Sequence, residues 1–111
     1  MEEYEIIITP DAEADLIELK NYITDVLLSR ETAKNYIQAL RKEIESLAHM
    51  PARYKTLDDE PWHTKGIRRT LVKNFYVYYR IEEDEKHVFI LNVIYTRRDQ
   101  LRMLDQISTD L

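Results

Sequence analysis

The apolar residues of this chain change their spacing once, and the change restricts the folds available to it. Between residues 10 and 50 they recur every three to four positions, which is the period of an amphipathic helix. Beyond residue 66 the chain instead consists of short stretches rich in β-branched and aromatic residues, joined by tight connections. A helical half followed by closely spaced strands predicts an α+β fold in which the helices pack on one face of a sheet.

The helical half is predicted to form an antiparallel hairpin. Thr9 and Pro10 are typical of a helix start, because the hydroxyl can cap free N–H groups and proline is well tolerated in the first turn. Ser29 is expected to cap a second helix, which Pro51 ends. Since the connection between the two helices is very short, they are expected to be antiparallel neighbours. The β-rich stretch Tyr4–Thr9 should form a short first strand.

The second half is expected to supply three further strands, at Ile67–Val72, Phe75–Ile81 and His87–Tyr95. Their short connections favour antiparallel pairing. After the last strand, Leu101, Leu104 and Ile107 recur at helical spacing, which predicts a short terminal helix. We therefore expect one domain spanning residues 1–111: an N-terminal strand, an antiparallel helical hairpin packed on a small, mainly antiparallel sheet, and a short C-terminal helix.

Alternation along the strands predicts which side chains are buried. One face of the third strand is wholly apolar and should meet the helices: Phe75, Val77, Tyr79 and Ile81. The opposite face carries Tyr76, Tyr78 and Arg80, and we expect Arg68 of the preceding strand to share it. The sheet is thus predicted to have one core face and one open, polar and aromatic face.

Composition excludes several classes of protein. The chain has no cysteine, which excludes a disulfide framework and a thiol nucleophile, and one glycine, which excludes glycine-rich phosphate loops. Its acidic start does not resemble a signal peptide, and no apolar run is long enough to span a membrane. The histidines are too scattered for a metal site. We expect a soluble, cytoplasmic protein without metal or cofactor.

The charges are unevenly distributed. The chain has 16 Lys and Arg residues against 21 Asp and Glu residues, a net charge of −5. Yet the segment Trp62–Ile81 carries five basic residues and no acidic one: Lys65, Arg68, Arg69, Lys73 and Arg80. This segment is either a docking surface for an acidic partner or an ordinary strand flanked by acidic loops.

Arginines interleaved with tyrosines on an open sheet face suit single-stranded nucleic acid, because guanidinium groups bind phosphate and rings stack on bases. The alternative is structural, since tyrosines favour half-exposed strands and arginines cover their rings. The segment Tyr95–Asp99 at the end of the last strand is expected to join this surface.

The long loop between residues 50 and 66 offers weaker candidates. His63 could act as a general acid or base, although a loop histidine is more often a surface residue. The acidic run Asp58–Glu60 could bind a divalent cation, but a solvated loop is the simpler interpretation. Trp62 is expected to anchor the loop on the core, the alternative being a contact with a partner.

Several motifs together resemble the RelE/ParE toxins of type II toxin–antitoxin systems. Thr9–Leu16 with Tyr22-Ile23 is similar to their first helix, and Ala33–Pro51 to their second helix and its exit. The sheet and its closing segment are matched by Gly66–Arg69, Tyr76–Ile81 and Ile90–Asp99. The resemblance runs from Tyr4 to about Leu104 and implies a helical hairpin on a small antiparallel sheet.

This resemblance implies a growth-inhibiting toxin, but the family has two kinds of target. ParE-type members poison DNA gyrase, whereas RelE-type members are ribosome-dependent endoribonucleases that need no metal. The Arg98-Asp99 ending and the pattern of the first helix favour the ParE type. A third alternative is a diverged, non-toxic interaction module of the same fold.

The resemblance also implies functional residues. If the protein is a nuclease, the catalytic candidates are Arg68, Tyr76, Tyr95 and Arg98. Three departures from the nuclease pattern stand at Thr70, at Tyr76 in place of an arginine, and at Arg102-Met103 in place of a tyrosine or histidine. The residues expected to contact a target are Arg68, Arg69, Tyr78, Arg80, Arg97 and Arg98.

The resemblance further implies partners. A cognate antitoxin is expected to cover the helical hairpin and part of the sheet with an amphipathic helix or strand. The other expected partner is DNA gyrase or, alternatively, a ribosome carrying mRNA. A homodimer and a toxin–antitoxin hetero-oligomer are both compatible with the sequence.

Overall fold

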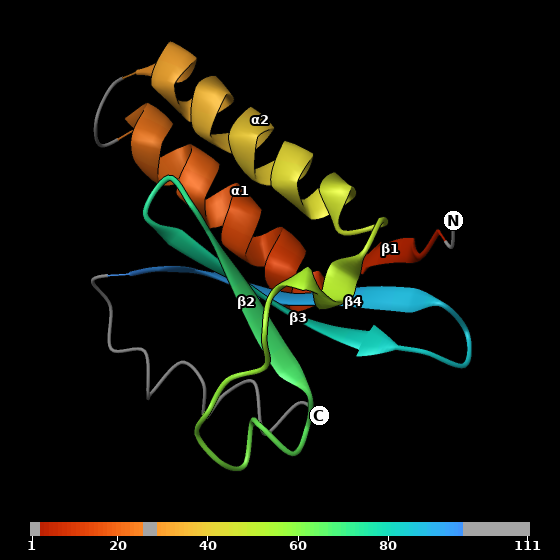
Figure 1. Ribbon diagram of the computed structural model, residues 1–111. Helices are drawn as coiled ribbons and strands as arrows, with labels where there is room; N and C mark the ends of the chain where they lie inside the picture. Colours follow the sequence, from red (N-terminus) through yellow and green to blue (C-terminus); the bar gives the residue numbers. More distant parts are fainter. Residues whose placement is uncertain (1–2, 26–28, 97–111) are drawn as a thin grey trace.

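The computed structural model describes residues 3–25 and 29–96, which form two helices and four strands (Figure 1). In chain order the elements are β1 (Glu5–Ile8), α1 (Pro10–Asp25), α2 (Arg30–Ser46), the short 3-10 helix η1 (Pro51–Arg53), β2 (Ile67–Val72), β3 (Phe75–Glu82) and β4 (His87–Tyr95). The predicted α+β fold and the predicted order of elements are confirmed. The predicted C-terminal helix lies outside the described residues.

The four strands form one sheet in the order β1-β4-β3-β2. The pairs β2–β3 and β3–β4 are antiparallel, whereas β1 runs parallel to β4, so the sheet is mixed but mainly antiparallel, as predicted. The helical hairpin lies on one face of the sheet (Figure 1). Strand β2 forms one edge of the sheet.

The principal core lies between the hairpin and the sheet. Buried side chains of α1 and α2, among them Leu16, Ile23, Leu40 and Ile44, pack against buried residues of β3 and β4. Ser29 begins α2 as predicted, because its side chain accepts a hydrogen bond from the backbone N–H of Thr32. The second helix ends at Ser46, before the predicted stop at Pro51, which instead begins η1. In the described part of the chain no helix has the length and apolar composition needed to cross a membrane.

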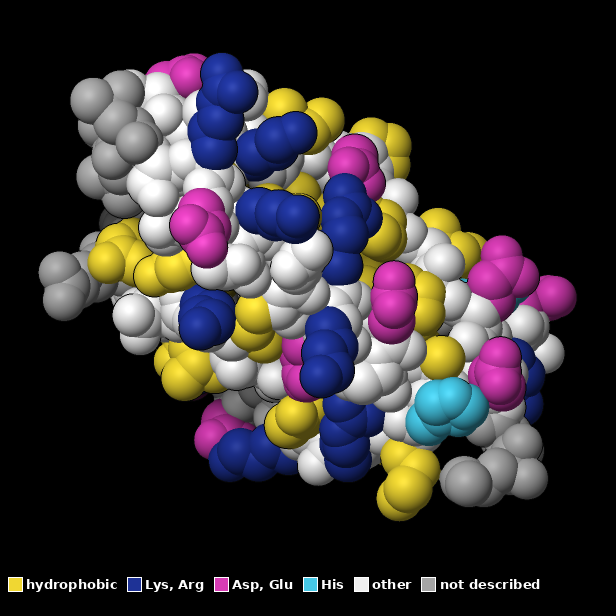
Figure 2. Space-filling model, turned by 90° about the horizontal axis from the view of Figure 1, so that it is seen from above, with side chains coloured by type: hydrophobic (Ala, Val, Ile, Leu, Met, Phe, Trp, Pro, Cys, Tyr) yellow, Lys and Arg dark blue, Asp and Glu magenta, His cyan; other side chains and the backbone are white. Residues whose placement is uncertain are grey.

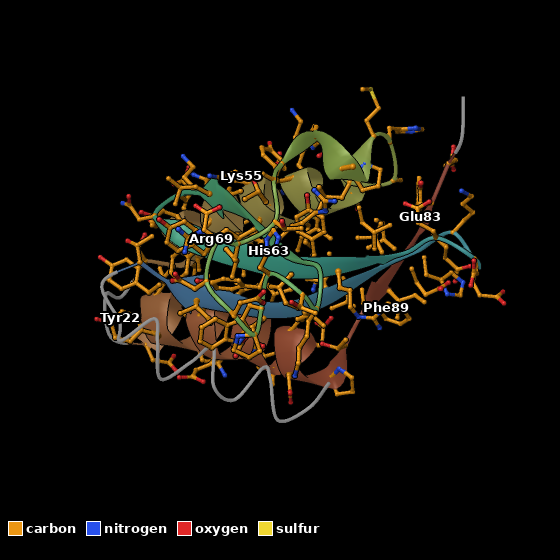
Figure 3. The ribbon with its side chains drawn as sticks, turned by 60° about the horizontal axis from the view of Figure 1, so that its bottom comes forward. Tyr22, Lys55, His63, Arg69, Glu83 and Phe89 are labelled. Carbon is orange, nitrogen blue, oxygen red and sulfur yellow. The ribbon has the colours of Figure 1, made fainter. Side chains whose placement is uncertain are left out.

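The face of the sheet that was predicted to be open carries a second core. Trp62, Ile67, Tyr78, Leu91 and Ile94 are buried together there. The loop between η1 and β2 supplies Trp62 and lies across the strands, as Figure 3 shows for the part that carries His63. The prediction of an open face was wrong because these strands contribute apolar side chains to both faces, and the loop covers the second set.

The pairing of β2 with β3 corrects the predicted position of Arg68. Cross-strand partners in an antiparallel pair point to the same face. Arg68 is opposite Tyr79, which packs in the principal core, whereas Arg69 is opposite Tyr78 of the second core. Arg69, and not Arg68, therefore shares a face with Tyr76 and Tyr78.

Candidate functional site

The face of the sheet opposite the helices holds an arginine packed among tyrosines. The guanidinium carbon of Arg69 lies 4.1 Å from the ring centre of Tyr76, and its Nη1 donates a hydrogen bond of 3.4 Å to the hydroxyl of Tyr78. The two tyrosine rings lie 6.0 Å apart. Arg69 remains half-exposed, so the stack orients its guanidinium group without removing it from solvent.

Tyr78 itself is fully buried. Burial raises the pKa of its hydroxyl above the ordinary value, although the hydrogen bond from Arg69 opposes this change. The ring is therefore neutral near pH 7 and acts as a support for Arg69. The side chain of Tyr78 does not reach the surface in this conformation. Its predicted role as a target contact stays a prediction.

A second stacked arginine lies further along β3. The guanidinium carbon of Arg80 is 4.7 Å from the ring centre of Phe89, and both side chains are half-exposed. Arg69 of β2 and Arg80 of β3 lie on the same face of the sheet, because Arg69 pairs with Tyr78, which is two residues from Arg80 along β3. This face thus presents two oriented positive charges.

Arg68 lies on the other face and holds the chain that follows α2. Its Nη1 donates hydrogen bonds to the backbone carbonyls of Tyr54, at 2.5 Å, and Ala52, at 3.5 Å. Close by, the hydroxyl of the buried Tyr79 donates to the carbonyl of Pro51 at 2.6 Å. These bonds fix η1 against the sheet, so Arg68 has a structural role in addition to its charge.

The carboxylate of Glu43 ties α2 to the same region. Its Oε2 accepts hydrogen bonds from Tyr54, at 2.8 Å, and from Thr70, at 2.9 Å, and lies 3.6 Å from Nη2 of Arg53. These donors hold the carboxylate in place, so Glu43 has a structural role. Thr70, one of the three positions that depart from the nuclease pattern, here donates its hydroxyl to Glu43 of α2.

Basic side chains gather around β2, the edge strand. We call the following set the basic edge: Arg53, Lys55, Lys65, Arg68, Arg69 and Lys73. Arg53 forms an ion pair with Glu43 at 3.6 Å, and Lys55 forms one with Asp58 at 3.2 Å. Figure 2, which views the molecule from above the helices of Figure 1, shows Lys and Arg side chains in a band with acidic side chains among them. Arg53 and Lys55 were not predicted to belong to this surface, because only the fold of the chain brings them beside β2.

Of the four nuclease candidates, the three that lie in the described residues are not brought together. Tyr76 lies on the face with Arg69, whereas Arg68 and Tyr95 lie on the helix-facing side. Arg68 is opposite Tyr79 and Tyr95 is opposite Phe75, a separation of about 13 Å along β3 at roughly 3.3 Å per residue. The remaining candidate, Arg98, lies outside the described residues, as does Arg97.

The candidate residues of the loop between η1 and β2 make contacts within the protein. Trp62 is 6% exposed and anchors the loop on the second core, as predicted. Nδ1 of His63 lies 2.9 Å from the carbonyl oxygen of Leu57 and 3.2 Å from the hydroxyl of Thr56, which braces the loop (Figure 3). Glu60 accepts hydrogen bonds from Thr64, and these lower the pKa of its carboxyl group. Within residues 3–25 and 29–96, no three His, Asp or Glu side chains are grouped in a way that could hold a metal ion.

A helical hairpin on one face of a mixed four-stranded sheet, with a basic edge strand, defines the class of this protein as RelE/ParE-like. A family model described as the ParE toxin of the type II toxin–antitoxin system parDE matches residues 6–100. The chain therefore belongs to the ParE toxin family and is a toxin of the type II class.

Solved structures share the fold at low sequence identity. The chromosomal ParDE toxin–antitoxin system from P. aeruginosa gives a TM-score of 0.71 at 20% identity, covering 87% of this chain and 100% of that one. The toxin–antitoxin complex RelBE2 from Mycobacterium tuberculosis gives 0.64 at 22% identity, covering 84% and 98%. A mutant of the E. coli toxin RelE in the free state also gives 0.64, at 13% identity, covering 95% and 98%. A search among curated proteins returned no matching sequence.

Proposed function

We propose that this toxin inhibits bacterial growth by poisoning DNA gyrase and that it acts by binding, without a catalytic step of its own. The observation that carries the proposal is the placement of the nuclease candidates. Arg68 and Tyr95 lie on one side of the sheet, about 13 Å apart along β3, and Tyr76 lies on the other. General acid–base cleavage of RNA needs its groups within hydrogen-bond reach of one phosphate.

The family match also supports gyrase poisoning as the proposed function, because the matching model describes ParE toxins. The two buried tyrosines of β3 are also poorly suited to proton transfer at neutral pH. Burial raises the pKa of Tyr78, and it raises that of Tyr79 to about 12. A general base is most effective when its pKa is near the working pH.

The target contacts in this proposal are the half-exposed arginines Arg69 and Arg80, together with Arg97 and Arg98. Arg69 and Arg80 are held in place by aromatic rings, so little side-chain entropy is lost when an acidic surface binds them. Arg68 contributes charge to the basic edge but is committed to the backbone carbonyls of the preceding segment.

The proposed regulatory partner is a cognate antitoxin encoded beside the toxin gene. Two of the similar solved structures are toxin–antitoxin assemblies, which supports a hetero-oligomer as the silent form. The toxin is proposed to act in the cytoplasm, where gyrase and the antitoxin would both be present.

The test is inducible expression in a bacterial host, with incorporation of labelled thymidine and methionine followed over the first minutes. We expect DNA synthesis to fall first, with induction of the SOS response, and co-expression of the adjacent reading frame to restore growth. Early loss of methionine incorporation with DNA synthesis spared would contradict gyrase poisoning and favour cleavage of ribosome-bound mRNA. Unchanged growth would contradict the toxin function itself.

A further inference from the structure

The end of β2 that leads into the turn before β3 is not covered by the loop that precedes the strand. That loop pairs with the start of β2 through a bridge between Thr56 and Arg68. The N–H of Leu57 also donates to the carbonyl of Ile67 at 2.8 Å. Leu71, near the other end of the strand, is 58% exposed. A large apolar side chain that stays exposed on an edge strand is a candidate contact for another chain.

The backbone of Leu71 is oriented for strand pairing. The N–H of Ile67 donates to the carbonyl of Trp62 at 3.1 Å, and its carbonyl accepts from Leu57, so both groups point away from β3. Because the direction of these groups alternates with a period of two residues, the N–H and C=O of Leu71 also point away from β3. In the part of the chain that the structure describes, neither group has a backbone partner. A strand laid beside this end of β2 can bond to both.

Positive charge flanks Leu71 on both faces of the sheet. Arg69 is half-exposed on the face opposite the helices, where its guanidinium group is held on a tyrosine ring at 4.1 Å. Lys73 is exposed at the turn, and its Nζ lies 5.9 Å from the ring of Tyr36 on α2, toward the helix-bearing face. The sequence from Trp62 to Ile81 contains no acidic residue that would offset these charges.

An extended segment fits this arrangement, because the side chains of a strand alternate between the two faces of the sheet that it joins. A carboxylate at one position of such a segment would meet Arg69 on one face. A carboxylate at the next position would point to the other face, where Lys73 lies. An apolar side chain between acidic ones would pack on Leu71.

We propose that the uncovered end of β2 pairs with an extended, acidic segment of the target protein, with Leu71 as the apolar contact and Arg69 and Lys73 beside the carboxylates of the segment. The inference rests on the proposed function and names the chemistry of the target contact. Backbone pairing fixes the position of the segment, and the two cations set its specificity.

Other occupants match this end of the strand less well. The phosphates of DNA suit Arg69 and Lys73 but leave Leu71 without an apolar contact. A second copy that paired through the same strand, centred on Leu71, would place its own Lys73 opposite Arg69, and like charges directly opposite each other are destabilising. Residues 97–111 of this chain contain three basic and three acidic side chains and so have no net charge.

The direct test measures binding of the purified full-length chain to purified gyrase, without DNA, by biolayer interferometry. We expect the wild type to bind with an affinity that falls as salt is added, and Leu71→Ser to weaken binding at least tenfold. The matched control is Ile17→Ser, which should change the affinity less than twofold, because Ile17 is 53% exposed but lies on α1.

Three results of this test would overturn the proposal. Binding that appears only when a short DNA duplex is added would identify DNA as the occupant. Equal losses in the Leu71→Ser and Ile17→Ser variants would remove Leu71 from the contact. An affinity that does not change with salt would contradict an acidic segment. The thermal midpoint of Leu71→Ser should stay within about 3 °C of the wild type, since a larger fall would show that the chain itself covers Leu71.

Two further variants test the backbone pairing. Leu71→Val keeps an apolar side chain and the N–H, whereas Leu71→Pro keeps the apolar character but removes the N–H, which points away from β3. We expect the Val variant to bind gyrase within threefold of the wild type and the Pro variant at least tenfold more weakly. Hydrogen exchange of the wild-type chain does not depend on the folding of a variant. Gyrase should slow exchange of the Leu71 N–H at least tenfold, and unchanged exchange would overturn the pairing.

A growth assay separates this inference from the proposed function. Induced Leu71→Ser should inhibit DNA synthesis much less than the wild type, whereas Ile17→Ser should inhibit it as strongly. Full inhibition by a folded Leu71→Ser chain would overturn the inference and leave gyrase poisoning intact. A wild-type chain that spares DNA synthesis would instead overturn the proposed function.

Discussion

Arg68 and Arg69 are neighbours in the sequence, but their guanidinium groups have different partners on opposite faces of the sheet. Arg68 donates hydrogen bonds to backbone carbonyls near η1, whereas Arg69 stacks on Tyr76 and remains half-exposed. The same residue type therefore serves structure at one position and is available for binding at the next. The pairing of β2 with β3 decides which of the two arginines faces the principal core and which faces the second core.

Replacing each arginine separately should separate these roles. We expect Arg68→Ala to lower the free energy of unfolding by about 1–2 kcal/mol, because carbonyls that accepted a charged donor lose it. Arg69→Ala should cost less than about 1 kcal/mol but should raise colony survival after induction at least tenfold. Urea unfolding and survival counts measure the two effects.

The control for this pair is Arg30→Ala, which removes an exposed arginine from the first turn of α2. It should change neither quantity appreciably. Full toxicity of a folded Arg69→Ala protein would remove this face of the sheet from the target surface.

The hydroxyl of Tyr79 should give the protein a distinctive response to alkaline pH. Burial raises the pKa of this group from 10.0 to about 12, so the folded state holds the proton more tightly than the unfolded state. The resulting stabilisation is complete below pH 10 and is lost as the pH rises toward 12, and the pKa difference corresponds to about 2–3 kcal/mol.

Urea unfolding between pH 9 and pH 11.5 tests this expectation. The stability of the wild type should fall more steeply over this interval than that of Tyr79→Phe, which has no ionisable group at the position. Parallel curves would show that Tyr79 does not hold its proton more tightly when folded.

At the scale of elements, the loop between η1 and β2 acts as a cover for the second face of the sheet. Trp62 anchors it, and the backbone N–H of Leu57 donates to the carbonyl of Ile67, which continues the edge pairing of β2. The loop thereby protects part of an edge strand and buries a second apolar cluster.

Trp62→Ala should therefore destabilise the whole protein, and not the loop alone. Loss of a large buried aromatic side chain costs about 3–5 kcal/mol, and this cluster is small, so a value near the lower end is expected. The matched control is Tyr22→Ala, since Tyr22 is 53% exposed and should cost under about 1 kcal/mol. Equal losses in the two variants by urea unfolding would contradict the second core.

The turn between β2 and β3 offers a stabilising change. Lys73 and Asn74 both have positive φ, at 52° and 67°, as in the type I′ turn that favours glycine at its second position. Asn74→Gly should raise the free energy of unfolding by about 0.5–1 kcal/mol by relieving backbone strain. Gly66→Ala, at φ 73°, should act in the opposite direction by a similar amount, and thermal unfolding of the two variants checks the signs.

Much of this element structure follows from local patterns. The caps of the helices, the two-residue turn and the strand bounds depend on neighbouring residues, so the sequence predicts them closely. The face of Arg68 was also within reach: a two-residue turn at Lys73 and Asn74 pairs Val72 with Phe75, and counting back from that pair places Arg69 opposite Tyr78.

Other features depend on contacts between distant segments, and alternation along a strand carries no information about them. Among these features are the cover that Trp62 supplies and the position of Arg53 and Lys55 beside β2. Parallel pairing of β1 with β4 likewise joins the two ends of the described chain.

At the scale of the whole molecule, the charge is divided between two surfaces. Five of the six charged residues of α1 are acidic, whereas the basic edge gathers six basic side chains around β2 at an edge of the sheet. The net charge of −5 conceals this division. Two surfaces of opposite sign allow one small chain to attract partners of opposite charge separately.

The most direct measurement of the central claim uses purified toxin, purified bacterial gyrase and supercoiled plasmid. We expect the wild-type chain to trap gyrase on cleaved DNA, seen as linear plasmid after detergent and protease treatment. We expect Arg69→Ala to reduce this product and Arg30→Ala to leave it unchanged. The contrary result is an absence of linear plasmid at every toxin concentration, together with cleavage of mRNA on isolated ribosomes.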